Sequence, residues 1–179
     1  MDASWSTDAQ AMQAIAAGDH MAFAKVHARL YPKLVRLATS VTCDREEARD
    51  VVQGAFVKLW KQAPRWEPRA TLDTWMWTVT LRDCLSVRRR IARTFDHALT
   101  DETRSAEDVV ADRQARERLR TLVGNLSPRE RAIVTLHLDE ERSPQQIAEL
   151  VGMSDGACRT ALSRALSRIR ERMEARHGQ

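Results

Sequence analysis

The sequence predicts an all-α protein made of two small helical domains joined by an acidic linker, the C-terminal domain being a helix-turn-helix. Strand signals are almost absent, whereas Ala, Arg, Leu and Glu are abundant. Apolar residues recur at helical spacing in both halves of the chain. Between the halves the apolar content thins and acidic residues dominate. We therefore expect domains at residues 8–93 and 114–177, with a linker at 94–113.

The first helices are marked by glycine and proline. A helix is expected at about residues 9–17, and Gly18 with Asp19 ends it before a second helix at about 20–41. Pro32 lies inside that second helix. Proline lacks the amide donor and clashes with the preceding turn, so we expect Pro32 to split or kink the helix.

The next helix has the clearest pattern of the N-terminal half. Asp44 is expected to cap its first amides, with Glu47 three residues later, and Pro64 follows its end. One apolar stripe runs along it, formed by Ala48, Val51, Val52, Ala55, Phe56, Leu59 and Trp60. The opposite face carries Asp50 and Gln53. Spacing alone favours a solvated surface there over a docking surface.

An aromatic and basic segment follows. Leu72, Trp75, Met76 and Val79 give another helical stripe. The neighbourhood is formed by Trp66, Trp75, Trp77, Arg82, Arg88, Arg89 and Arg90. Rings that stack on bases and cations that meet phosphates suit single-stranded nucleic acid. That Trp75 is a core residue beside solvated arginines is an equally good interpretation of the pattern itself.

The C-terminal half has its own start signals. A short amphipathic helix is expected from about residue 115 to 126, and Ser127 with Pro128 begins the next one. Ser143 and Pro144 then start a helix that ends at Gly152, whose lack of a side chain suits a left-handed turn. Ser154 caps a further helix that continues to about residue 176. This order of signals is typical of a helix-turn-helix.

The last helix would be the recognition helix. Its inner side carries Ala161, Leu162, Ala165, Leu166 and Ile169. Its outer side places Asp155, Arg159, Thr160 and Ser163 where bases would be read. Arg164 and Arg168 follow where the DNA backbone would be held. An interaction helix with a solvated basic face is the less favoured interpretation.

Composition limits the function classes. The chain has a net charge of +4 and a pI near 9.3. Its basic residues lie in two blocks on either side of the acidic linker, which favours a polyanionic partner. The three cysteines lack metal or disulfide spacing and the histidines form no metal motif, so no metal or cofactor is expected. No nucleophile–base pair or phosphate loop indicates an enzyme. No apolar run is long enough for membrane insertion, which predicts a cytoplasmic protein.

Several blocks together resemble the extracytoplasmic-function sigma factors of bacterial RNA polymerase, a group of the sigma-70 family, over about residues 11–173. Gly18-Asp19 with Ala22-Phe23 looks like the family's early signature. Asp50-Val51-Val52-Gln53 with Phe56 and Leu59-Trp60 looks like its polymerase-clamp helix, and Thr74-Trp75 to Val79 like its minus-10 region. Residues 126–131, Ile147-Ala148, Gly152-Met153-Ser154 and Gly156 look like its minus-35 domain. The joint order and spacing of these blocks are specific.

The resemblance implies a non-enzymatic protein that takes core RNA polymerase to promoters. Asp50 and Gln53 would contact the clamp helices of the polymerase β′ subunit, which replaces the solvated interpretation of that face. Residues 66–90 would hold the melted minus-10 strand with one base flipped out of the stack. The recognition helix would read the minus-35 duplex, and the acidic linker would thread the polymerase channels. The family also implies an anti-sigma factor as a further partner.

The sequence departs from the family at three positions. Gly54 stands where members usually have Glu, which removes a carboxylate and predicts weaker polymerase binding. Arg82 replaces a usual Asn, and Ser86 replaces a later Asp or Asn. Arginine only donates hydrogen bonds, whereas asparagine also accepts them, so the resemblance does not fix the flipped base.

A second hypothesis comes from another class. The chain would then be a helix-turn-helix operator-binding regulator that does not associate with core polymerase, with its N-terminal half used for dimerisation or sensing. Such a regulator would need a palindromic site. A sigma factor would instead form a complex with core enzyme and bind promoter DNA poorly by itself.

Overall fold

A computed structural model describes residues 3–95 and 126–177, and all regular structure in these ranges is helical. The elements are α1 (Ala3–Ala16), α2 (His20–Thr42), α3 (Arg45–Gln62), the 3-10 turn η1 (Ala63–Arg65), α4 (Leu72–Phe95), α6 (Pro128–Leu138), α7 (Pro144–Val151) and α8 (Asp155–His177). The all-α prediction is confirmed. The expected linker, apart from its first two residues, and most of the expected helix at 115–126 lie outside the described residues.

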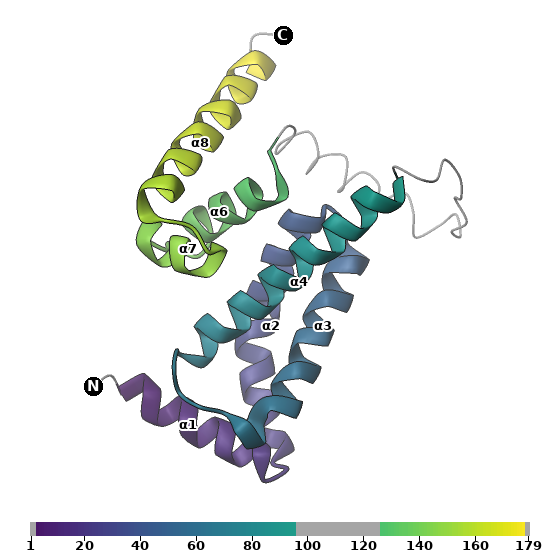
Figure 1. The fold of residues 1–179 in the computed structure, drawn as a ribbon, viewed down its shortest axis with the longest axis vertical. Helices are drawn as coiled ribbons and strands as arrows, with labels where there is room; N and C mark the ends of the chain where they lie inside the picture. Colours follow the sequence, from purple (N-terminus) through teal and green to yellow (C-terminus); the bar gives the residue numbers. More distant parts are fainter. Residues whose placement is uncertain (1–2, 96–125, 178–179) are drawn as a thin grey trace.

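The N-terminal helices form a bundle in which α2, α3 and α4 lie side by side and α1 crosses one end (Figure 1). Leucines from α2 occupy its centre, and Leu30, Leu34 and Leu37 are fully buried. They meet the apolar stripe expected on α3, of which Val52 and Leu59 are fully buried. Burying a leucine side chain contributes roughly 1.5–3 kcal/mol relative to exposure, so this stripe holds the bundle together.

Pro32 does not split α2, which runs without interruption from His20 to Thr42. The expectation of a split at this position is therefore wrong, and an uninterrupted helix does not test the expectation of a kink. Pro32 leaves the carbonyl of Ala28 without its helical donor, but both residues are exposed and water can serve that carbonyl. The buried leucines on both sides of Pro32 keep the helix on the core.

Aspartate caps begin the next helices. The Asp19 carboxylate accepts hydrogen bonds from the amides of Met21 and Ala22, and Asp44 does the same at the start of α3. These contacts satisfy amides that have no partner inside a helix. The predicted start of the helix at Asp44 is confirmed.

The C-terminal helices form the expected helix-turn-helix. Ser143 caps α7 in a capping box with Gln146, and Gly152 adopts the left-handed conformation with φ of 66°. The Ser154 hydroxyl then accepts from the amide of Ala157 in the first turn of α8. Ser127 caps α6 in the same way, through a second capping box with Glu130.

The two groups of helices pack directly on each other. The buried guanidinium of Arg131 in α6 donates to the carbonyl of Val41 at the end of α2, at 2.8 Å. Burial lowers the pKa of Arg131. The Glu140 carboxylate accepts from Arg36 at 2.9 Å and lies 3.4 Å from the Lys33 ammonium. The contact is also apolar, because one cluster of buried hydrophobic residues continues from the first group of helices into the second.

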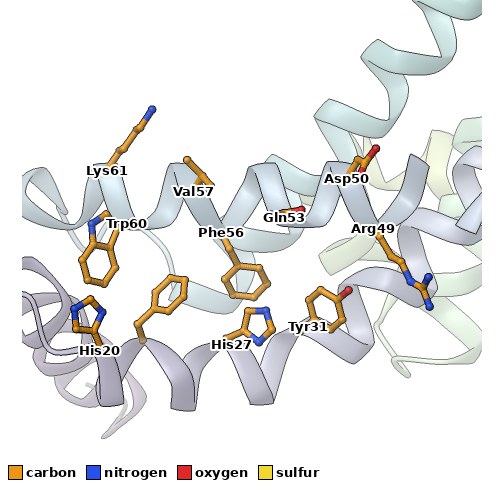
Figure 2. Close-up of a pocket in the computed structure, with 11 residues that line it drawn as sticks. His20, His27, Tyr31, Arg49, Asp50, Gln53, Phe56, Val57, Trp60 and Lys61 are labelled. Carbon is orange, nitrogen blue, oxygen red and sulfur yellow. The ribbon is translucent and has the colours of Figure 1, made fainter. Parts of the chain in front are cut away.

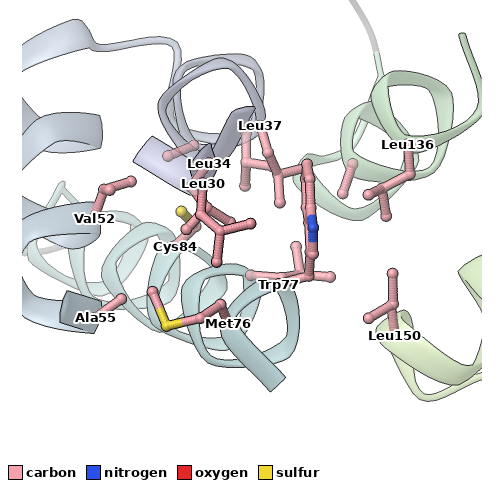
Figure 3. Packing of buried hydrophobic residues seen from close by; sticks show 14 of the residues in the cluster. Leu30, Leu34, Leu37, Val52, Ala55, Met76, Trp77, Cys84, Leu136 and Leu150 are labelled. Atoms are coloured by element: carbon pink, nitrogen blue, oxygen red, sulfur yellow. The ribbon is translucent and has the colours of Figure 1, made fainter. Parts of the chain in front are cut away.

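Trp77 lies at the centre of this contact. Its side chain faces Leu136 of α6 and Leu150 of α7 (Figure 3), and only 1% of the residue is exposed. The guanidinium of Arg142 covers the ring, 5.1 Å from its centroid. The observed arrangement is thus closed, with the C-terminal helices covering one face of α4.

In the described ranges, 3–95 and 126–177, the structure has no helix with the length and apolar character required to cross a membrane.

Candidate functional site

An aromatic groove of about 930 Å³ runs between α2 and α3 (Figure 2). We call it the α2–α3 groove, and it is lined by His20, Phe23, His27, Tyr31, Arg49, Asp50, Gln53, Phe56, Val57, Trp60 and Lys61. Asp50 and Gln53, the polymerase-contact residues expected from the resemblance, both line this groove and are exposed. The structure therefore brings these two side chains together beside an apolar surface.

Ring contacts across the groove join the two helices. His20 of α2 stacks on Trp60 of α3 with centroids 5.2 Å apart, and the ring of His27 lies 4.5 Å from that of Phe56 in α3. Phe23 meets Trp60 edge to face at 5.3 Å. Sequence reasoning missed the contribution of α2, although its four rings recur at i, i+3, i+7 and i+11, which is a helical stripe.

Charges surround these rings. Arg49 and Lys61 supply cations at the groove, and Asp50 supplies an anion. Val57 adds an exposed apolar side chain, with 47% of the residue accessible. Aromatic residues with a polar and charged rim are the composition of protein-binding surfaces, so the groove suits a protein partner.

A second hollow lies between the end of α3 and the start of α4. Its volume is about 440 Å³, and it is lined by Gln62, Arg65, Trp66, Glu67, Arg69, Ala70 and Trp75. We call it the tryptophan pocket. Trp66 meets Trp75 edge to face, with ring centroids 5.8 Å apart. Two of the three tryptophans expected at the minus-10 strand are therefore adjacent, and Arg65 and Arg69 add cations that sequence reasoning had not selected.

Trp77, the third of these tryptophans, lies on another face. Two residues along a helix correspond to about 200° of rotation, so Trp77 points away from Trp75. It is buried in the contact with the C-terminal helices and is inaccessible in the closed arrangement. The core tryptophan of this segment is therefore Trp77, whereas Trp75, for which the core interpretation was given, is half-buried, as is Trp66.

The polar side chains expected at DNA continue along α4. Arg82, Ser86, Arg89 and Arg90 are all exposed. Asp83, beside them, accepts hydrogen bonds from the Lys58 ammonium at 2.7 and 2.6 Å, which ties α4 to α3. We call Arg82, Ser86, Arg89 and Arg90 the basic row of α4. The basic row lies on a helix whose position is fixed by α3.

The outer side of α8 is open to solvent. Arg159, Thr160, Ser163, Arg164 and Arg168 are exposed, and Asp155 is half-buried. The Asp155 carboxylate accepts a hydrogen bond from Arg159 and forms an ion pair with it. This contact raises the pKa of Arg159. Arg168 forms an ion pair with Glu130 at 2.8 Å. Glu130, which belongs to the capping box of α6, therefore also holds this arginine.

No group of side chains within 3–95 and 126–177 has the arrangement of a metal site. The three cysteines are buried and unpaired. Burial raises the pKa of the Cys84 thiol to about 12, and the neighbouring Asp83 acts in the same direction. A thiol with such a pKa is not a nucleophile at neutral pH.

Comparison with known families assigns both halves of the chain. Residues 26–94 match the family described as "Sigma-70 region 2", and residues 116–169 match "Sigma-70, region 4". Together they cover more than half of the chain. The first match contains the α2–α3 groove lining from His27 onward, and the second contains α7 and most of α8, the two helices of the helix-turn-helix.

Similar proteins of known sequence agree with this assignment. The chain is 28% identical over 145 residues to an RNA polymerase sigma-E factor of Streptomyces avermitilis, covering 80% of each chain. It is 28% identical over 169 residues to the extracytoplasmic-function sigma factor SigM of Mycobacterium tuberculosis, covering 91% of this chain and 83% of that protein.

Solved structures share the fold. CnrH, solved in complex with the cytosolic domain of CnrY, superimposes with a TM-score of 0.71 at 22% identity, covering 94% of this chain and 97% of CnrH. The sigma factor RpoE of Bartonella quintana, solved with the anti-sigma factor NepR, gives a TM-score of 0.66 at 22% identity, covering 85% and 96%.

These matches decide between the two hypotheses. An operator-binding regulator is not favoured, because its N-terminal half would have no reason to match region 2, whereas a sigma factor requires both regions in this order. The chain belongs to the sigma-70 family of RNA polymerase sigma factors, in its extracytoplasmic-function group.

Proposed function

We propose that three surfaces of this sigma factor bind different ligands. The protein binds core RNA polymerase and directs transcription initiation at specific promoters. The α2–α3 groove holds polymerase, the tryptophan pocket with the basic row of α4 holds the melted minus-10 strand, and α8 reads the minus-35 duplex. The observation that carries this proposal is the exposed pair Asp50 and Gln53 beside an aromatic groove in region 2.

The groove is suited to one or more helices of a protein. Its stacked rings supply rigid apolar area, which costs little conformational entropy on binding. Asp50 accepts hydrogen bonds and Gln53 both donates and accepts them. These side chains support binding to the clamp helices of the β′ subunit, as the family resemblance implies.

The tryptophan pocket is suited to a base. An unstacked base finds aromatic surface on Trp66 and Trp75, and cations at Arg65 and Arg69 for the adjoining phosphates. The indole N–H of Trp66 is buried without an acceptor in the described part of the chain. An acceptor atom on a captured base would satisfy it. The exposed side chains of Arg82, Ser86, Arg89 and Arg90 extend the strand path along α4.

The recognition helix is available to duplex DNA in the closed arrangement. Asp155, Arg159, Thr160 and Ser163 lie on its first turns, where base edges are read in the major groove. Arg164 and Arg168 follow at the level of the phosphates. The first turns of α8 would therefore provide sequence specificity, and the arginines that follow would provide affinity for the DNA backbone.

Promoter binding requires the two helical groups to separate. Elements named for positions −10 and −35 lie about 25 base pairs apart, which is about 85 Å of B-form DNA. In the closed arrangement α4 and α7 are in contact, so one chain cannot engage both elements. Residues 96–125 connect the groups. Separation would also uncover Trp77.

An anti-sigma factor is a further partner that this proposal includes. The RpoE structure was solved with one, and the α2–α3 groove offers a surface where such a protein would exclude polymerase. The protein would act in the cytoplasm, where polymerase is found. It would act by recruitment and strand capture, with no bond made or broken by its own side chains.

In vitro transcription tests the proposal. Purified core polymerase is supplied with this chain on a library of randomised promoter fragments, and transcripts are sequenced. We expect transcripts that depend on the chain and share two upstream elements. Retention of the fragments by the chain alone, on palindromic sites and without polymerase, would support an operator-binding regulator instead.

A further inference from the structure

A buried carboxylate of α1 holds the first turn of α4. The Asp8 side chain accepts a hydrogen bond from the backbone amide of Leu72 at 2.8 Å, across 64 positions of sequence. Asp8 is 7% exposed and Leu72 is fully buried. The first amides of a helix have no partner inside it, so a side chain from another helix here acts as the cap.

Arg29 of α2 completes this contact. Its guanidinium lies 2.7 Å from the Asp73 carboxylate and 3.7 Å from that of Asp8. Thr71, just before α4, accepts from the amide of Thr74 at 3.1 Å. Two other helices, α1 and α2, therefore fix where α4 begins and in which direction its first turn points.

That first turn carries one wall of the tryptophan pocket. Trp75 follows Leu72 by one turn, and its ring meets the edge of Trp66, which lies just after η1. Helix α1 also packs against η1, which leads into Trp66. A shift of the Leu72 amide away from Asp8 would move Trp75 relative to Trp66 and change the shape of the pocket.

We propose that Asp8, supported by Arg29, is a positioning residue for capture of the single strand. It touches no DNA but sets the spacing of the two tryptophan rings that receive the base. Asp8 precedes residue 26, where the match to region 2 begins, so the family match gives this residue no role. The inference rests on the proposed function of the tryptophan pocket.

The test compares two caps with the same chemistry. Asp8→Ala removes the carboxylate that caps the Leu72 amide of α4 and leaves the Thr71 cap in place. Asp19→Ala removes the carboxylate that caps α2, which accepts from Met21 and Ala22 at 2.8 and 3.0 Å. Asp8→Ala loses one buried hydrogen bond to backbone and the contact with Arg29, whereas Asp19→Ala loses two exposed bonds, so each loss of bubble affinity is compared with that variant's own melting temperature. Asp8→Asn is the conservative variant, since its amide oxygen still accepts from Leu72.

The probes are a selected promoter fragment as duplex and the same fragment with its minus-10 segment mismatched to form a bubble. Each variant is assembled with saturating core polymerase, and bubble binding is measured by fluorescence anisotropy. For Asp8→Ala we expect about tenfold weaker bubble binding, the effect of one such hydrogen bond, with Asp8→Asn restoring most of it. Core polymerase affinity should stay within about twofold of wild type.

Equal losses of bubble affinity in Asp8→Ala and Asp19→Ala, in proportion to their melting temperatures, would show a purely structural role for Asp8. Unchanged bubble binding in Asp8→Ala would overturn the inference directly. If the wild-type complex itself failed to prefer the bubble to the duplex, the proposed function of the tryptophan pocket would fail instead.

Discussion

The guanidinium of Arg131 donates to the carbonyl of Val41 at 2.8 Å and to that of Leu126 at 2.9 Å. One buried side chain thus joins the end of α2 to the start of α6. The Val41 carbonyl lies in the last turn of α2, where helix geometry leaves it without a donor, so a charged donor from the other half satisfies it. Stability of the closed arrangement therefore depends on an arginine whose own helix belongs to the DNA-reading half.

Replacing Arg131 should destabilise the protein. Arg131→Ala leaves two buried carbonyls without these donors, and we expect the free energy of unfolding to fall by about 2–4 kcal/mol. Urea denaturation followed by circular dichroism measures it. The matched control is Arg129→Ala, because Arg129 is an exposed arginine two residues away. Equal losses in the two variants would contradict the role of Arg131.

The Glu140 carboxylate should control how far the halves separate. Glu140→Ala removes the partner of Arg36 and Lys33 across the contact, and we expect a larger radius of gyration in small-angle X-ray scattering. Raised salt should have the same effect on wild type because it screens the pair. Asp139→Ala is the control, since Asp139 is an exposed neighbour of equal charge. An unchanged radius in Glu140→Ala would argue against this prediction.

Asp50 and Gln53 should contribute to polymerase binding but not to the fold. Both are exposed, so Asp50→Ala with Gln53→Ala should leave the melting temperature unchanged. Loss of two interface contacts of this kind costs about 2 kcal/mol, or roughly thirtyfold in Kd for core polymerase. Surface plasmon resonance with immobilised core enzyme measures the change. Gln13→Ala with Glu67→Ala is the control with exposed side chains of the same chemistry, and the two double variants should differ clearly.

Gly54 and Gly18 should respond in opposite directions to alanine. Gly54 lies inside α3, and a Cβ there would meet nothing within 4 Å. Gly54→Ala should therefore raise the free energy of unfolding by about 0.5–1 kcal/mol. Gly18 has a φ of +88°, which strains a residue with a side chain. Gly18→Ala should therefore lower the free energy of unfolding by about 1–2 kcal/mol. Thermal denaturation of both variants checks the pair, and a loss in Gly54→Ala would contradict it.

Cys84 should resist alkylation in the folded protein. Its thiol pKa is raised to about 12 by burial, so little thiolate exists at pH 8.5. Iodoacetamide followed by peptide mass spectrometry should label Cys84 in urea and leave it unlabelled in buffer. Because the folded pKa is the higher one, the stability that the neutral thiol contributes is present at neutral pH and is lost as the pH rises toward 12. Rapid native labelling of Cys84 would refute this.

Local chemistry made the helix-turn-helix predictable. Ser143, Gly152 and Ser154 act through contacts within a few residues, and each does in the structure what its type indicates. The apolar stripe of α3 was predictable for the same reason, because helical periodicity places it on one face. Pro32 was misjudged because its effect depends on whether the freed carbonyl meets water, which is a tertiary property.

Contacts between distant segments were not predictable from single residues. Arg131 and Arg142 have the same sequence appearance as solvated arginines, yet one is buried and the other covers Trp77. Asp8 looked like an acidic residue near a chain start, and its partner lies 64 positions away. The α2–α3 groove needed both helices in register, although the ring spacing on α2 was visible in the sequence.

The pairing of Arg159 with Asp155 has a consequence for promoter choice. To bond a base edge, the arginine has to leave a carboxylate that already holds it. A guanine with two acceptors replaces that partner fully, whereas a base with fewer acceptors leaves the exchange incomplete. If Arg159 reads a base, as we propose, Asp155 would compete with the DNA for it and would penalise incorrect sequences more than correct ones. Its removal should make the helix less discriminating while it binds random DNA more tightly.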